Sequence, residues 1–284
     1  MEIGIMEIGG LIGAAAGASI ASLIFENLGF LFSFGILALC NLIFGTFIIV
    51  FVVKKDNIQD IKILPQSEEL NMKDVLFKNA GVLLNFFANS LCAGPNFLIM
   101  VGFKIYVKSL VDNEYVISFI ISLLWIGSIF GVLVFKLVYK IEHENKLLFI
   151  VGLMEIVVLP FYGPDPLFLI TDSTACLVLM GLAFFLTGIA MEITFMITTK
   201  KLLVELLKVF PKKKELCIDV ANGMYTASFK LIEFVVPLIG GLLLETVSYS
   251  RISTIYDVIL LLFFFLYWSK IDLNDNSYRT MEEE

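Results

Sequence analysis

Apolar residues in this chain are gathered into blocks of about twenty positions, separated by short polar segments. A block of that length crosses a hydrocarbon core of about 30 Å as an α-helix. Inside lipid every backbone polar group must be satisfied within its segment, which favours helices over open strands. The pattern therefore predicts an all-α, polytopic membrane protein with eight transmembrane helices. They cover approximately residues 6–26, 28–53, 75–103, 115–139, 147–163, 174–199, 217–244 and 252–269.

The longest polar stretch, residues 54–74, separates the first two apolar blocks from the other six. It contains Pro65 and no apolar block, which is typical of a linker between domains. We therefore expect a two-helix unit at 1–53, a cytosolic linker at 54–74, a six-helix unit at 75–271 and an acidic tail at 272–284.

Composition agrees with a membrane protein and narrows the chemistry. Hydrophobic residues make up 59% of the 284 positions and charged residues 17%, against about 25% charged in soluble domains. Four scattered cysteines and the single histidine, His143, form no metal-ligand or nucleophile–base pattern. We expect no cofactor, no metal and no enzymatic activity. The net charge of −7 does not indicate a nucleic-acid partner.

The distribution of basic residues predicts the orientation in the membrane. If residues 54–74 are cytosolic and the eight helices alternate, sixteen of the twenty lysines and arginines lie on the cytosolic side. Three lie outside, namely Lys104, Lys108 and Arg251, and Lys230 lies within a span. By the positive-inside rule both termini are then cytosolic, in a vesicular, endomembrane or plasma membrane.

One small-residue helix is used twice. Residues 17–26 (GASIASLIFE) align with residues 236–245 (VPLIGGLLLE), and both segments end in a glutamate. Small residues allow close helix packing in membranes. An internal duplication of this kind indicates a transporter built from two structural halves.

The glycine pattern of residues 6–30 resembles the antiporter motif on helix five of the major facilitator superfamily. Gly13 and Gly17 match that motif, and Pro237, Gly240 and Gly241 match its equivalent on helix eleven. The resemblance implies that these five residues serve helix bending and packing. Asn89-Ser90-Leu91, Leu159-Pro160 and Gly163-Pro164 are similar to the vesicular amine transporter branch, in particular its polyamine transporter-like members.

The alignment runs from the family's fifth helix to its twelfth. The resemblance therefore implies a major facilitator-type helical bundle that is N-terminally truncated. Residues 1–53 would be a remnant of the N-terminal half and residues 75–271 a complete C-terminal half.

Ionisable side chains at membrane depth are costly and usually face a cavity or a partner. Lys230 and Glu233 are three residues apart and share a helical face. They form either a cavity-lining pair, in which Glu233 binds a cationic solute or a proton, or an intrahelical ion pair that neutralises itself. Glu192 either lines the cavity or contacts Lys230. For Glu155 we expect snorkelling or structural pairing.

Asn85 and Asn89 are four residues apart and precede Gly94-Pro95 in the 75–103 span. Asparagine amides at this depth serve as donors to a solute or as interhelical hydrogen bonds. Because the family's seventh helix lines its pathway, the resemblance favours the first role.

These features predict a secondary active transporter that moves a small organic solute by alternating access. A cationic amine is the candidate solute and the proton the candidate coupling ion. The alternative is a non-transporting, truncated membrane protein.

Overall fold

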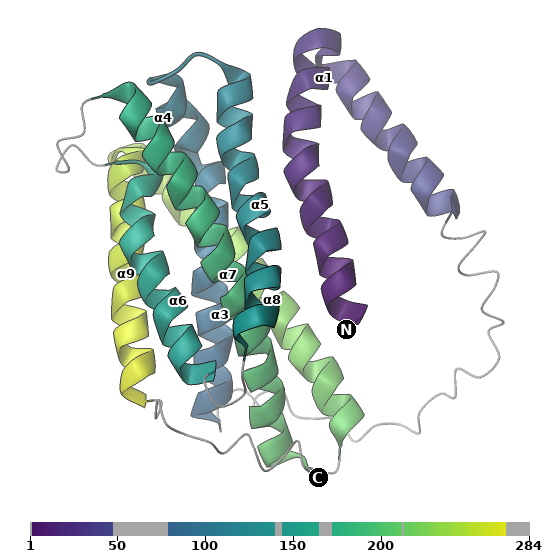
Figure 1. Cartoon of the computed structure of the whole chain (residues 1–284), viewed down its shortest axis with the longest axis vertical. Helices are drawn as coiled ribbons and strands as arrows, with labels where there is room; N and C mark the ends of the chain where they lie inside the picture. The colour runs from purple at the N-terminus through teal and green to yellow at the C-terminus, as the bar shows by residue number, and fades with distance from the viewer. Residues whose placement is uncertain (1, 48–78, 140–143, 165–171, 212, 271–284) are drawn as a thin grey trace.

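In the computed structural model the chain is a bundle of long helices (Figure 1). The structure describes residues 2–47, 79–139, 144–164, 172–211 and 213–270. Within these ranges there is no β-strand, and six helices are long and apolar enough to cross a membrane. The chain is therefore an integral, multi-pass helical membrane protein. The predicted linker at 54–74 and the acidic tail lie outside the described residues.

The first helix, α1, spans Glu2–Phe47 and is broken at Gly29. Gly29 has φ 77° and ψ 178°, a backbone conformation that glycine adopts without steric cost because it has no Cβ. Figure 1 shows the result, two helical arms that diverge from a turn. The arms correspond to the predicted spans 6–26 and 28–53, but neither is among the six membrane-crossing helices, so the expected number of eight is not reached in the described residues.

The next span is a composite. It consists of α3 (Ala80–Leu98), the π-helical turn η2 (Ile99–Phe103) and α4 (Lys104–Lys108). Asn79 caps its start by accepting hydrogen bonds from the backbone N–H groups of Gly81 and Val82, at 2.9 and 3.3 Å. The helix continues through Pro95. Most of this span is buried by its neighbours.

Five further helical segments complete the bundle. The helix α5 spans Glu114–Val138, and α6 (Glu144–Val158) continues into the 3-10 turn η4 (Leu159–Tyr162). The last three helices are α7 (Ser173–Val209), α8 (Lys214–Leu244) and α9 (Tyr249–Lys270). Asn113 and Asp172 cap α5 and α7 by accepting backbone N–H bonds.

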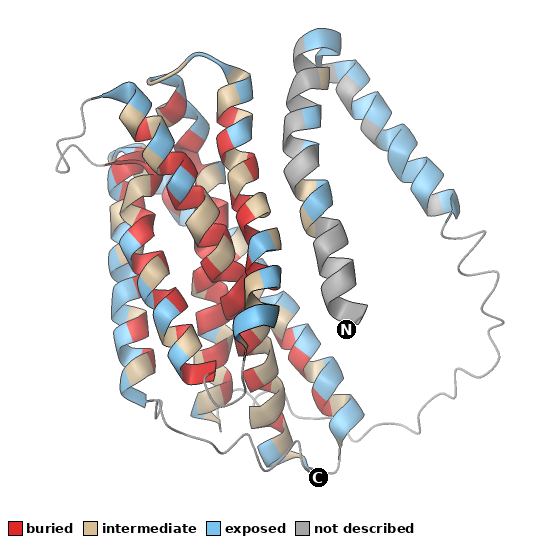
Figure 2. Ribbon diagram, in the orientation of Figure 1, coloured by how far each residue is buried: buried red, intermediate tan, exposed pale blue. Residues whose placement is uncertain are grey.

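The helices α5 and α7 approach each other most closely because glycines line their contact. A Cβ added at Gly127 would collide with the backbone oxygen of Phe185, and one at Gly188 with that of Leu124. Small residues at such positions let two helix backbones approach in a membrane protein. Figure 2 shows buried residues gathered where α3, α5, α6 and α7 meet, whereas the second arm of α1 is largely exposed.

The glycines of the duplicated segment differ in their surroundings. A Cβ added at Gly240 would lie 2.7 Å from Val101 Cγ2, so α8 packs closely on the α3 span there. At Gly13, Gly17 and Gly241 an added Cβ would meet no atom within 4 Å. The close packing expected at these three glycines is therefore absent from the described structure, although α1 does contact α5. Pro237 lies inside α8 without ending the helix.

Candidate functional site

The helix α8 has two contrasting faces. Its buried face carries small and apolar residues that pack on the bundle, namely Cys217, Ala221, Met224, Ser228, Ile232, Val236 and Gly240. The opposite face carries a polar stripe, which we define as Asp219, Asn222, Thr226, Lys230 and Glu233. The spacings of three and four residues place all five on one side of the helix.

The polar stripe is solvent-accessible in the described structure although it belongs to an apolar span. The side chains of Lys230 and Glu233 are 65% and 36% exposed, and Lys230 Nζ lies 2.5 Å from Glu233 Oε2. The expected pair is therefore formed. The exposed residues beside it, such as Leu231, Phe234 and Leu238, are apolar. Charged groups within one stripe of an apolar helix require water or a polar partner opposite them.

Glu192 lies elsewhere. It is 5% exposed on α7 and borders α5, since a Cβ added at Gly131 would lie 2.9 Å from Glu192 Cβ. Lys230 has its ion pair with Glu233 instead. The structure therefore does not bring the three charged residues of the predicted pathway into one cluster.

Asn89 joins three helices at the centre of the bundle. Its Nδ2 donates to Ser228 Oγ on α8 at 2.5 Å, and its Oδ1 accepts from Thr198 Oγ1 on α7 at 3.2 Å. The neighbouring Ser90 donates to the backbone oxygen of Ser228 at 2.9 Å. All four side chains are buried. In this conformation Asn89 acts as an interhelical hydrogen-bonding group, one of the two roles open to it.

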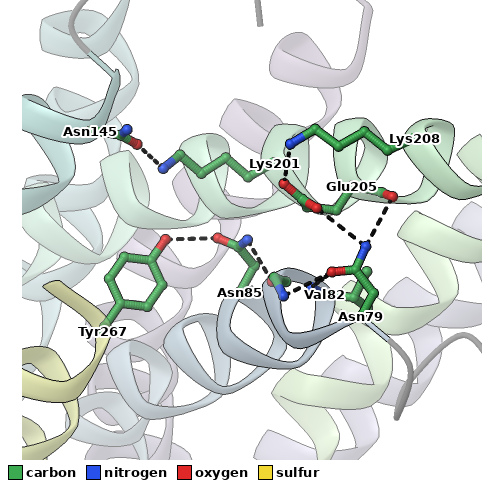
Figure 3. A network of polar contacts seen from close by, with 9 residues as sticks. Asn79, Val82, Asn85, Asn145, Lys201, Glu205, Lys208 and Tyr267 are labelled. Atoms are coloured by element: carbon green, nitrogen blue, oxygen red, sulfur yellow. Dashed lines mark hydrogen bonds and ion pairs between the residues drawn. The ribbon is translucent and has the colours of Figure 1, made fainter. Parts of the chain in front are cut away.

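Asn85 belongs to a set of polar contacts that connects the ends of α3, α7 and α9 (Figure 3). Its Oδ1 accepts a hydrogen bond from Tyr267 on α9, and its Nδ2 donates to the backbone oxygen of Gly81, both at 2.8 Å. Nearby, Asn79 Nδ2 donates to Glu205 Oε2 at 3.2 Å, which connects the start of α3 to the end of α7.

The same end of the bundle holds two lysines of α7. Lys201 is buried and donates to Asn145 Oδ1 on α6 (Figure 3). Lys200 forms an ion pair with Glu144 at 3.1 Å, and it also donates to the hydroxyl of Tyr139, which donates in turn to Glu144. Burial and the hydrogen bond to Glu144 raise the pKa of Tyr139 to about 12. These contacts connect α5, α6 and α7 outside the apolar spans.

The structure contradicts the prediction that Glu155 snorkels or forms a structural pair. It neither snorkels nor forms an ion pair among the described residues, because its side chain is fully buried in α6 and both carboxyl oxygens are without a hydrogen-bond partner.

Several polar groups escaped the sequence reasoning for identifiable reasons. Thr198, Ser228 and Tyr267 are single polar groups in apolar spans and carry no charge that would single them out. Lys201 falls just beyond the apolar block at 174–199 and was expected to lie in a loop, whereas α7 continues to Val209. A regular helical period through residues 200–209 is the only signal that could have found it.

Comparison of the chain with protein-family models, with curated proteins and with solved structures gives no match. The fold and the arrangement of polar groups therefore define the class of protein, a multi-pass helical membrane protein, and carry the argument for its function.

Proposed function

We propose that this protein works as a secondary transporter of the major facilitator type and that the polar stripe of α8 lines its solute pathway. The supporting observation is the exposed Lys230–Glu233 pair on an otherwise apolar span. A charged group at membrane depth is costly unless it faces water, a cavity or a polar partner. A pathway along this face would supply that water.

In this proposal Glu233 binds a small organic cation, an amine in the first instance, and Lys230 is the counter-ion displaced when the cation arrives. A carboxylate is the natural partner for an ammonium group, and charge-assisted hydrogen bonds contribute about 1.5–3 kcal/mol. Glu192 on α7 and Asn85 and Asn89 on α3 serve the conformational change from buried positions in the bundle.

The finer architecture is part of the proposal. The two arms of α1 are its first two spans and the six apolar helices are one structural half, with a cytosolic location for the lysine-rich end of the bundle. The contact of α1 with α5 supports an arrangement in which the two units meet along α5.

Uptake by proteoliposomes tests this function. The purified chain is reconstituted, a pH gradient is imposed, and accumulation of radiolabelled spermidine is measured. We expect accumulation that E233Q reduces by about 10- to 100-fold, the equivalent of one charge-assisted hydrogen bond. E192Q should abolish accumulation.

The matched control is E245Q, because Glu245 is an exposed acidic residue at the far end of the same helix. It should transport like the wild type. Absence of accumulation by the wild-type chain with this probe and with other small cations would contradict the proposal and favour the non-transporting membrane protein.

A further inference from the structure

Glu155 is a buried acid, and no group in the described residues is placed to stabilise its ionised form. It lies in α6, and none of its surface is accessible. Neither Oε1 nor Oε2 accepts or donates a hydrogen bond. No lysine, arginine or histidine of the described residues forms an ion pair with it; Glu144, which pairs with Lys200, lies at the opposite end of α6.

The groups near Glu155 come from other elements of the bundle, α3, α9 and η4. From α3 the Cys92 thiol lies beside it. From α9 come Asp257, whose charge acts on Glu155, and Tyr256. The Tyr256 hydroxyl is engaged elsewhere, because it donates to the backbone oxygen of Leu91 at 2.7 Å.

Two unsatisfied hydroxyls add to this polar interior. The Tyr162 hydroxyl, from η4, is close enough to Glu155 for an electrostatic interaction and has no hydrogen-bond partner. On α7, Thr194 Oγ1 is likewise buried and unpartnered, and it neighbours the Cys92 thiol. One oxygen of Asp257 is buried without a partner as well, although its residue is only half-buried. All of these groups are neutral or acidic.

An ionised carboxylate in such a place costs several kcal/mol, because neither a counter-ion nor a donor replaces its lost hydration. The neutral acid avoids that cost. A metal ion is a poor alternative, since no group of three or more histidine, cysteine, aspartate or glutamate side chains within the described ranges is placed to hold one. The ligand that fits the site is a single proton.

We propose that Glu155 is a proton-binding site, occupied in the conformation described and emptied when the helices around it move and admit water. On release, the O–H bond of the acid breaks, the oxygen keeps the electron pair and the proton passes to the entering water. Asp257, which is half-buried and near Glu155, is the candidate for the next acceptor. If the protein is a transporter, this site makes the proton its coupling ion, and that role rests on the proposed transport function. Proton binding by Glu155 is independent of the transport function.

Infrared spectroscopy of the full chain in lipid nanodiscs tests the proposal directly. At pH 7 the wild type should show the carbonyl stretch of a protonated carboxylic acid, and E155Q should lack that band. C92A should shift the band's frequency without removing it, because the thiol beside the carboxyl group is lost. The control D257N should keep it. A wild-type spectrum identical to that of E155Q in this region would overturn the proposal.

Thermal unfolding provides a second readout. Glutamine has the shape of a neutral glutamic acid, so E155Q should melt at the wild-type temperature at pH 6. If a hidden partner stabilises an ionised Glu155, E155Q would melt markedly lower, and the proposal would be wrong.

Uptake and spectroscopy together separate the two proposals. If the carboxylic acid band is present and spermidine does not accumulate, the proton site is supported and the transport function is contradicted. If spermidine accumulates and the band is absent, the transport function is supported and the proton site is contradicted.

Discussion

The residues that matter most here are polar side chains inside an apolar bundle, and their roles depend on which helix face they occupy. Lys230 and Glu233 form their pair on the exposed face of α8, whereas Ser228, two residues earlier, lies buried against Asn89. Sequence spacing alone predicts that Lys230 and Glu233 share a face. It does not predict what that face meets, because the rotation of a helix about its axis is decided by packing against its neighbours.

Glu155 is a second residue whose surroundings could not be predicted from the sequence. Its position in a short apolar block suggested a residue that reaches for the interface, yet its side chain is buried beside residues of α3 and α9. The energetic penalty of a buried acid can be recognised from sequence, but the absence of a partner becomes visible only in three dimensions.

The cluster of Tyr139, Glu144 and Lys200 predicts how the stability of the folded protein depends on pH. Because the pKa of Tyr139 is raised from 10 to about 12 in the folded protein, its neutral form favours folding. This contribution is fully present below about pH 10 and is lost as the pH rises toward 12. The unfolding temperature of the wild type should therefore fall more steeply from about pH 10 to 12 than that of Y139F. Parallel pH profiles for the two proteins would contradict the assignment.

Helices were the most predictable level of the structure. Each of the six apolar blocks from residue 75 onward corresponds to one of the membrane-crossing helices. Hydrophobic length determines these spans, since a helix must cover the hydrocarbon core. Their ends were less predictable. The helix α7 runs ten residues past its expected end at 199, because Lys201 and Glu205 find polar partners on α6 and at the start of α3.

The α5–α7 contact carries the prediction at the scale of elements. In G127A the new methyl group would collide with the backbone of Phe185, which cannot move like a side-chain tip. We expect a loss of about 1–3 kcal/mol in the free energy of unfolding, typical of overpacking, measured by denaturant titration in detergent micelles.

The matched control for G127A is G223A. An added Cβ there meets no atom within 4 Å, so this variant should be neutral or gain up to about 1 kcal/mol from helix propensity. Equal losses in both variants would show that α5 and α7 do not approach as closely as described.

The described residues combine a well-packed interior with a helix, α8, that packs on the bundle through one face. Buried residues concentrate between α3, α5, α6 and α7 (Figure 2), whereas the residues of the polar stripe of α8 are exposed or half-buried. Sequence duplication and composition predicted a membrane protein with two related halves, and the helical membrane class is confirmed. The relation between the halves stays a prediction, since α1 contacts the bundle mainly through α5.

The central claim, that the polar stripe of α8 faces an aqueous pathway, is tested most directly by cysteine labelling. Thr226 lies within the stripe, and Leu231 is 41% exposed on the adjoining apolar face of the same helix. With the four native cysteines replaced, T226C and L231C are each introduced and exposed to a membrane-impermeant maleimide in intact proteoliposomes. The account predicts rapid labelling of T226C and none of L231C. Protection of both residues, or equal labelling of both, would contradict it.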